Sequence, residues 1–132
     1  RKWGRIVNIA TVAAKFPGEI RVLSGSTRAA LANYTVAVSK VVARHNVMIN
    51  NVLPGMHHSA FVEKQFGERA AAKGTSYEQE VAEFSRDWRI AAERFGDCDD
   101  VGAIVALFCS QFANYTTGQS LVIDGGATTS TF

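Results

Sequence analysis

Three short apolar runs along the chain have the pattern of buried β-strands. They span residues 4–10, 46–53 and 120–124 and are rich in β-branched side chains. A turn that contains Pro or Gly follows each of them. Apolar character that is nearly continuous, rather than alternating, is typical of strands covered on both faces, as in a parallel sheet.

A long helix is predicted between the first two runs. From Thr27 to His45, apolar positions recur at alternating spacings of four and three, and no Gly or Pro interrupts them. Ser26 or Thr27 is expected to cap the first turn. Tyr34 lies beside the stripe, which predicts a side chain packed in the core or in an interface. The stripe consists of Leu31, Thr35, Val38, Val42 and His45.

The segment after the second run is less regular. Residues 56–74 mix His, Ser, Phe, Lys and Gly, which indicates a mobile loop with a short helix. A further helix is expected to follow Thr75 or Ser76, because Glu78 stands at capping-box distance from Thr75. We expect this helix to end near Ile90.

The last helix completes an alternation of strands and helices. Asp99 is expected to cap it, and its apolar stripe is Val101, Ile104, Val105, Phe108 and Phe112. Such alternation indicates right-handed crossovers, a parallel sheet and a three-layer α/β fold. The 132 residues are expected to form a single domain over positions 1–132. With only three strands, at least one sheet edge needs a partner chain or a missing half.

Composition and charge exclude several classes of protein. Hydrophobic residues make up 47% of the chain and charged residues 20%, as in soluble globular domains. No run approaches the roughly 20 apolar residues that span a bilayer, and no signal peptide is expected. The net charge of +2 is too small to favour nucleic acid as a partner. Cys98 and Cys109 are too few for a disulfide framework, which predicts reduced thiols in a cytoplasmic protein.

Three pieces of the sequence match one enzyme family in order and spacing. The first is the strand of residues 4–9, and the second is the strand and turn of residues 47–55. The third lies in the C-terminal part of the chain and consists of residues 94–97, 118–119 and 123–126. Together they resemble the C-terminal half of the short-chain dehydrogenases/reductases, in the 3-oxoacyl-carrier-protein-reductase-like branch. The resemblance implies a partial Rossmann-like sheet that lacks the N-terminal dinucleotide-binding half. It also implies a small carbonyl or alcohol substrate and a nicotinamide cofactor.

The catalytic positions of that family carry other side chains here. Thr11 falls where the family has the Ser that bonds the substrate carbonyl, and Thr retains the hydroxyl. Ser24 stands in place of the family's Tyr, and Arg28 in place of its Lys. A Ser hydroxyl is a far weaker acid than that Tyr, and Arg stays protonated near neutral pH, so ordinary carbonyl reduction is in doubt. Some branches of the family resemble this chain in carrying Ser-x-x-x-Arg.

Only half of a dinucleotide site is expected. The family's Gly-rich turn, which receives the pyrophosphate, has no counterpart in the sequence. NAD or NADP is therefore implied by the resemblance, but no cofactor is expected if the chain is complete. On the nicotinamide side, the resemblance assigns Asn50, Pro54, Gly55 and Ser59. A solvated loop position is the equal alternative for Ser59, which stands where the family has a hydroxyl that touches the carboxamide.

Two further expectations concern the oligomeric state and an alternative function. The helix of residues 27–44 resembles one that forms dimer contacts in the family, which implies a homo-oligomer. The alternative function is a scaffold without redox activity. One form of it is an esterase-like hydrolase that uses Ser24, Ser26 or Ser59 with one of the histidines. An inert fragment is a third outcome. No metal is expected, because the adjacent His57 and His58 cannot share one helix face as zinc-binding histidines do.

Overall fold

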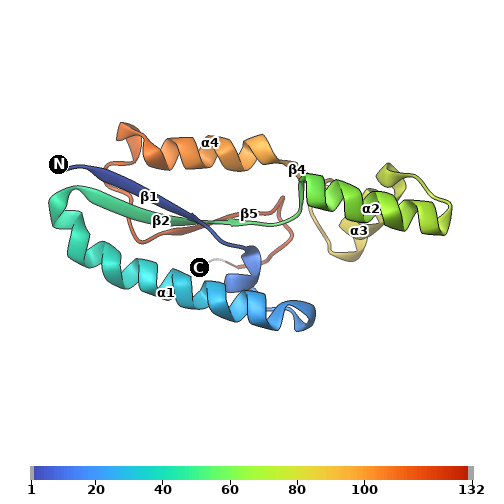
Figure 1. Ribbon diagram of the computed structural model, residues 1–132, viewed down its shortest axis with the longest axis horizontal. Helices are drawn as coiled ribbons and strands as arrows, with labels where there is room; N and C mark the ends of the chain where they lie inside the picture. The colour runs from blue at the N-terminus through green and yellow to red at the C-terminus, as the bar shows by residue number, and fades with distance from the viewer. Residues whose placement is uncertain (1, 131–132) are drawn as a thin grey trace. The chain divides into compact units, whose positions relative to one another are not determined.

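A computed structural model describes residues 2–130 of the chain (Figure 1). These residues divide into two compact units. The first contains the chain up to residue 54 together with residues 99–123, and the second contains residues 55–98 and those from 124 onward. Each unit has its own cluster of buried hydrophobic side chains.

A three-stranded parallel sheet forms the centre of the first unit. Its order is β1 (Gly4–Ile9), β2 (Val47–Pro54) and β5 (Ser120–Ile123), so the three predicted strands are confirmed. The helices α1 (Val22–Val42) and α4 (Cys98–Cys109) cover opposite faces of this sheet (Figure 1). The predicted three-layer α/β class is therefore confirmed.

The face of the sheet under α4 is apolar. Val52 and Phe108 are the large side chains of its buried cluster. Phe112 was expected to continue the stripe of the last helix, and this prediction is wrong. The helix ends at Cys109 and Phe112 lies in a 3-10 turn, η4 (Gln111–Ala113), with 93% of its surface exposed. The other stripe residues pack against the cluster as predicted: Val101, Ile104, Val105 and Phe108.

The face under α1 holds a buried polar network instead. Thr35 Oγ1 donates to Asn51 Oδ1 at 2.9 Å. Asn8 Nδ2 donates to the same two oxygens, at 3.0 and 3.2 Å. Asn51 Nδ2 donates in turn to Ser120 Oγ at 2.9 Å. Because buried polar groups must find partners, this network fixes α1 laterally against all three strands.

The predicted boundaries of the long helix are wrong at its start. The helix begins at Val22, so neither Ser26 nor Thr27 caps it. Thr27 Oγ1 instead donates to the carbonyls of Leu23 and Ser24, at 2.9 and 3.2 Å, as a hydroxyl inside a helix does. The periodicity missed the first turn because its buried residue is Gly25 rather than a large apolar side chain.

The other end of the long helix and the start of the last one also differ from expectation. His45, expected to end the stripe, is exposed in a 3-10 turn, η3 (Ala43–His45). The last helix begins at Cys98, so Asp99 lies in its first turn and does not cap it. A carboxylate in that turn still faces the positive end of the helix dipole.

The second unit contains a pair of helices. A mobile loop with a short helix was expected over residues 56–74, but α2 (Ala60–Lys73) occupies most of that range, so the helix is longer than predicted. α3 (Tyr77–Asp87) follows and ends before Ile90. Two short strands, β3 (His57–His58) and β4 (Gly96–Asp97), pair in parallel and were not predicted.

The capping box of α3 lies one residue later than predicted. Ser76 Oγ accepts from the Gln79 amide at 3.2 Å, and Gln79 Oε1 accepts from the Ser76 amide at 2.8 Å. Thr75 is not the cap, because its hydroxyl donates to Glu80 Oε1 at 2.8 Å. The sequence pattern was compatible with a cap at Thr75 or at Ser76. Because the Thr75 hydroxyl bonds Glu80, Ser76 is the cap.

Aromatic rings that pack edge to face form the core of the second unit. Phe95 is 1% exposed, and the rings of Phe66 and Phe84 meet it edge-on with centroids 5.2 and 5.6 Å away. Such edge-to-face pairs are stabilising beyond the area that they bury. The buried members of the cluster are Phe66, Val81, Ile90 and Phe95.

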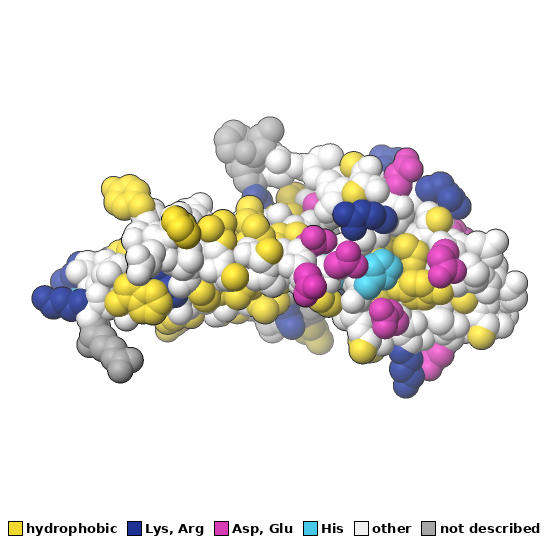
Figure 2. Space-filling model, turned by 90° about the horizontal axis from the view of Figure 1, so that it is seen from above, with side chains coloured by type: hydrophobic (Ala, Val, Ile, Leu, Met, Phe, Trp, Pro, Cys, Tyr) yellow, Lys and Arg dark blue, Asp and Glu magenta, His cyan; other side chains and the backbone are white. Residues whose placement is uncertain are grey.

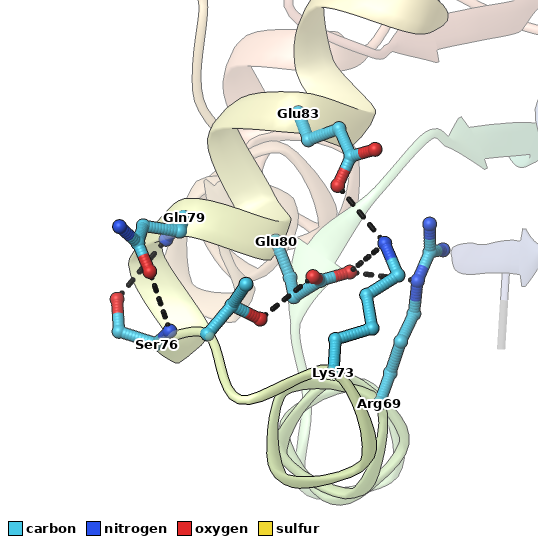
Figure 3. A network of polar contacts seen from close by, with 7 residues as sticks. Arg69, Lys73, Ser76, Gln79, Glu80 and Glu83 are labelled. Atoms are coloured by element: carbon cyan, nitrogen blue, oxygen red, sulfur yellow. Dashed lines mark hydrogen bonds and ion pairs between the residues drawn. The ribbon is translucent and has the colours of Figure 1, made fainter.

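A buried carboxylate joins α2 to α3 (Figure 3). Glu80 Oε2 lies 2.7 Å from Arg69 Nε and 3.0 Å from Lys73 Nζ. Burial alone would raise the pKa of Glu80, but the hydrogen bonds from Thr75 and Lys73 and the charges of Lys73 and Arg69 lower it below its ordinary 4.5. Glu80 therefore stays ionised and ties the two helices together.

Apolar side chains also remain on the surface of the first unit. Figure 2 shows hydrophobic side chains gathered over α4. Tyr34 on α1 is 62% exposed, so it does not belong to the core. Cys98 and Cys109 are both free and exposed. Within residues 2–130, no helix has the length and apolar character needed to cross a membrane.

Candidate functional site

Thr11 lies beyond the carboxyl end of β1, where the chain leaves the sheet. It is the N-cap of a 3-10 turn, η1 (Val12–Ala14), and its Oγ1 accepts from the Ala13 amide at 3.5 Å. The side chain is half-buried. An accepting hydroxyl keeps its own proton, so Thr11 can donate to a ligand at this edge of the sheet.

Ser24 and Arg28 lie one turn apart on α1, on the same side of the helix. Ser24 is half-buried and Arg28 is exposed. Gly25 brings this turn against η1, because a Cβ at Gly25 would lie only 2.8 Å from the carbonyl oxygen of Ala13. The turn that carries Thr11 and the turn that carries Ser24 are therefore in contact.

The chemistry of these three side chains is limited to donation of hydrogen bonds. The hydroxyls of Thr11 and Ser24 can stabilise negative charge on a substrate oxygen. The Arg28 guanidinium can bond a ribose or a phosphate. None of the three titrates near neutral pH, so none can act as the acid or base of the reaction.

An open cavity of about 310 Å³ lies between α1, η1 and the start of β5. This volume is at the lower end for small-molecule sites. Thr11, Ser24 and Arg28 do not line it. Its lining consists of Ala14, Lys15, Ala32, Leu53, Gly118, Gln119 and Ser120.

The assigned nicotinamide-side residues of the first unit differ in their surroundings. Asn50 is 1% exposed; its Nδ2 donates to the Thr116 carbonyl at 2.9 Å, and its Oδ1 accepts from the Gln119 amide at 3.0 Å. Both polar ends of Asn50 thus hold the turn before β5, which gives this side chain a structural role. Pro54 is half-buried at the carboxyl end of β2, opposite Ile123.

Gly55 and Ser59 belong to the second unit. Ser59 is the N-cap of α2, and its Oγ accepts from the Val62 amide at 3.3 Å. It is therefore a half-buried cap and not a freely solvated loop residue. The carbonyl of Gly55 lies 3.3 Å from His57 Nδ1. The Ser59 hydroxyl keeps a proton that it can donate.

A histidine–tyrosine pair stands next to Ser59 and was not predicted. His58 Nδ1 lies 2.7 Å from Tyr77 Oη, so the two side chains share a hydrogen bond. The ring of His58 also packs against Phe95, with centroids 5.6 Å apart. The two partners are far apart in sequence and lie on β3 and α3, so no local spacing in the sequence could have revealed the pair.

The arrangement expected for a serine hydrolase is not assembled within either unit. Of the three candidate nucleophiles, Ser24, Ser26 and Ser59, none has its hydroxyl hydrogen-bonded to a His. His57 and His58 use Nδ1 for Gly55 and Tyr77, and the Nε2 of His45 accepts from Arg44 at 3.2 Å. A triad is defined by such bonds, so the geometry gives this alternative no support. Among residues 2–130, no three His, Cys, Asp or Glu side chains are grouped to hold a metal ion.

Comparison with known proteins identifies the family. The model described as enoyl-(acyl carrier protein) reductase matches residues 1–128. The chain therefore belongs to the short-chain dehydrogenase/reductase family, as its sequence pattern predicted.

Individual relatives and solved structures agree with this assignment. The chain is 33% identical to the 3-oxoacyl-[acyl-carrier-protein] reductase FabG of Aquifex aeolicus, over 96% of this chain and 46% of that protein. It is 30% identical to the NADPH-dependent reductase BacG of Bacillus subtilis, over 96% and 48%.

The NADPH-bound structure of a short-chain oxidoreductase from Pseudomonas aeruginosa PAO1, which contains an atypical catalytic center, has a TM-score of 0.82. That match covers 95% of this chain and 46% of the other, at 23% identity, and therefore shows the fold alone. The chain spans about half the length of the proteins that it matches.

Proposed function

We propose that this chain supplies the substrate side and the nicotinamide side of an oxidoreductase that interconverts a carbonyl and an alcohol. Family membership supports the reaction class. The observation that carries the proposal is the contact at Gly25, which holds the turn of Ser24 against the turn of Thr11. The sequence resemblance assigns these positions to the family's catalytic side chains. The NADPH-dependent reductase BacG of Bacillus subtilis, which is 30% identical to this chain, supports a nicotinamide cofactor.

Each side chain at these positions has a role that its chemistry allows. Thr11 and Ser24 donate hydrogen bonds to the oxygen of the substrate and so stabilise the charge that develops on it. Arg28, which is exposed and one turn beyond Ser24, bonds the ribose or a phosphate of the nucleotide. The three side chains orient and polarise the substrate, and they leave proton transfer to another group.

The residues assigned to the nicotinamide side have chemistry that suits a dinucleotide, each within its own unit. Pro54 ends β2 at the carboxyl edge of the sheet, where ligands of open α/β folds bind. Ser59, at the first turn of α2, retains a hydroxyl proton for the carboxamide. When bound, the cofactor supplies or accepts the hydride.

The adenosine side does not fit. In residues 2–130, β1 runs into the 3-10 turn η1 without a Gly-rich loop, and no other strand of the three-stranded sheet leads into one that opens a helix. None of the described residues is therefore assigned to the pyrophosphate.

Nucleotide binding is the first test. Titration of the chain with NADH and NADPH, followed by nucleotide fluorescence, is expected to saturate. Ser59→Ala should weaken binding by about 3- to 10-fold, the effect of one lost hydrogen bond, and Ser59→Thr should restore it. Ser26→Ala, an exposed position on α1, is the matched control. If neither nucleotide binds at millimolar concentration, to this chain or to a longer polypeptide that contains it, the proposal is refuted.

We also propose that two copies of the chain associate through the outer side of α1. Leu23, Tyr34 and Val41 are 83%, 62% and 60% exposed, and their spacing places them on one side of the helix with Ala30 and Ala37. An apolar seam of this kind on a surface helix marks an interaction site. The corresponding helix forms dimer contacts in proteins of this family, which favours a second copy as the partner.

Sedimentation velocity tests the association. Wild-type chain is expected to sediment as a dimer or larger oligomer, and Tyr34→Glu should shift it toward monomer because a buried unpaired charge is costly. Lys40→Glu changes an exposed charge on the same helix and serves as the control. A monomeric wild-type chain at high micromolar concentration contradicts the proposal.

A further inference from the structure

The cavity between α1, η1 and the start of β5 is formed by the first unit alone. Its volume of about 310 Å³ is large enough for a small molecule, and every residue of its lining belongs to that unit. Thr11, Ser24 and Arg28 are outside the lining, so the proposed catalytic positions do not account for it. The chemistry of the lining indicates what kind of molecule the cavity can bind.

A series of buried hydrogen bonds ends at this cavity. Thr35 Oγ1 and Asn8 Nδ2 both donate to Asn51 Oδ1, at 2.9 and 3.2 Å. The orientation of the Asn51 amide is thereby fixed, and its Nδ2 donates to Ser120 Oγ at 2.9 Å. Thr35 and Asn51 are each 0% exposed, so water cannot replace these bonds. The donors of the series therefore all lead toward Ser120.

The hydroxyl of Ser120 is the end of the series and has a proton to spare. A Ser hydroxyl carries one proton, and because Ser120 Oγ accepts from Asn51, it keeps that proton for donation. Among residues 2–130, no group accepts it. Ser120 lines the cavity, so a molecule bound there can provide the acceptor. The cavity thus favours a ligand that carries an accepting oxygen.

Lys15 gives the cavity a positive charge. It is the charged residue of the lining, which includes no Asp or Glu of the described chain. Within residues 2–130, no carboxylate lies at ion-pairing distance from Lys15. Its Nζ lies 5.8 Å from the centroid of the Phe16 ring, and this cation–π contact restrains the ammonium without neutralising it. An ammonium without a counter-charge favours an anionic ligand.

Gln119 adds a second oriented donor, and the rest of the wall is apolar. The backbone amide of Gln119 donates to Asn50 Oδ1 at 3.0 Å, and its Nε2 donates one hydrogen to the Thr117 carbonyl at 3.1 Å. The second Nε2 hydrogen has no acceptor among the described residues and is available to a ligand. Small or apolar side chains make the remaining wall: Ala14, Ala32 and Leu53.

We propose that this cavity is a binding site for a small carboxylate with an apolar body. The Ser120 hydroxyl and the Gln119 amide donate to the carboxylate oxygens, and Lys15 supplies the opposite charge. The apolar wall removes the body of the ligand from water. A carboxylate suits the lining better than a phosphate does, because one cation balances one negative charge. The site lies within the first unit and does not depend on the proposed oxidoreductase activity.

Benzoate and its neutral isostere benzamide test the recognition of charge. Titration of the chain with benzoate, followed by ¹H–¹⁵N NMR, is expected to saturate with a Kd of roughly 0.1–1 mM, as ligand efficiency allows for so small a molecule. The amide signals of Lys15, Gln119 and Ser120 should shift. Benzamide should bind at least about 10-fold more weakly, because it lacks the charge. Lys15→Gln should raise the Kd for benzoate by about 3- to 10-fold. Lys40→Gln removes an exposed charge of α1 outside the lining and should leave the Kd unchanged.

A steric pair of variants tests the place of binding. Ala32→Leu fills the cavity from α1 and is expected to abolish saturable binding, whereas Ala29→Leu, at an exposed position of the same helix, should bind as wild type does. Ser120→Ala should raise the Kd by about 3- to 10-fold, the effect of one lost hydrogen bond. If Ser120→Ala does not fold because Asn51 loses its acceptor, the Ala32 and Ala29 variants still decide.

Three results would each overturn the inference. They are no saturable binding at tens of millimolar benzoate, equal Kd values for benzoate and benzamide, and unchanged binding of benzoate by Ala32→Leu. Failure of the chain to bind a nucleotide would instead count against the proposed function and would leave the carboxylate site unaffected.

Discussion

Adding one methyl group at Gly25 should separate α1 from the turn that carries Thr11. A Cβ there would lie 2.8 Å from the carbonyl oxygen of Ala13 and 3.5 Å from its carbonyl carbon. The obstacle is backbone and cannot rotate away, so the helix or η1 must shift. Overpacking of this kind costs about 1–3 kcal/mol, while Ala in place of Gly gains about 1 kcal/mol in a helix. Gly25→Ala should therefore range from neutral to about 2 kcal/mol destabilising.

Two other helical glycines provide matched controls. A Cβ at Gly102 in α4 or at Gly67 in α2 meets nothing within 4 Å. Gly102→Ala and Gly67→Ala should each stabilise the chain by up to about 1 kcal/mol, from helix propensity alone. Gly25→Ala should thus be less stable than either control by about 1–3 kcal/mol.

Urea unfolding followed by circular dichroism measures this difference. With a slope of about 2 kcal/mol per molar urea, a difference of about 2 kcal/mol separates the midpoints by roughly 1 M. If Gly25→Ala is stabilised as much as Gly102→Ala, the helix does not contact η1 as described. That result would also remove the support for placing Ser24 beside Thr11.

Three further predictions test contacts of the second unit. Phe95→Ala should lower the free energy of unfolding by about 3–5 kcal/mol in urea titrations, because the ring is 1% exposed among aromatic edges. The lowered pKa of Glu80 means that its stabilising contribution is present above the ordinary pKa of 4.5 and is lost as pH falls through the folded value. Thermal melts in mild acid should therefore show a weaker pH dependence for Glu80→Gln than for wild type, and an identical dependence would contradict the assignment. Ser76→Ala should cost about 1 kcal/mol by removing the capping box, whereas Ser26→Ala, at an exposed position within α1, should change stability by less than about 0.5 kcal/mol.

The strands were predictable because each is a short run rich in apolar and β-branched side chains and is followed by turn residues, although only β2 is buried along most of its length. Each strand of the three-stranded sheet is a short, nearly continuous apolar run. The start of α1 has no comparable apolar pattern, because its buried residue there is Gly25 and a glycine adds nothing to a hydrophobic stripe. The helix at residues 60–73 was predicted only as a short one for a related reason: within it only Phe66 and Ala70 are buried, which is too few to define a stripe.

The candidate site was predictable only as far as the family resemblance reached. That resemblance assigned Asn50 to the cofactor, whereas its side chain is used by the backbone of Thr116 and Gln119. A buried Asn that satisfies two backbone groups has the same sequence signature as one that contacts a ligand. The pairing of His58 with Tyr77 joins two elements, one of which was not predicted, and so required the three-dimensional structure.

The replacement of the family's Tyr by Ser does not by itself distinguish an enzyme from a scaffold. The Thr11 and Ser24 hydroxyls can still polarise a carbonyl, and the one missing function is proton transfer. The hydrogen bond between His58 and Tyr77 lies within the second unit, and a scaffold could use it as well as an enzyme. If the pair only stabilises the second unit, His58→Gln and Tyr77→Phe should lower stability alone. Loss of carbonyl reduction in a Ser24 variant that still folds and binds nucleotide would instead show that the replaced position keeps a role in the chemistry.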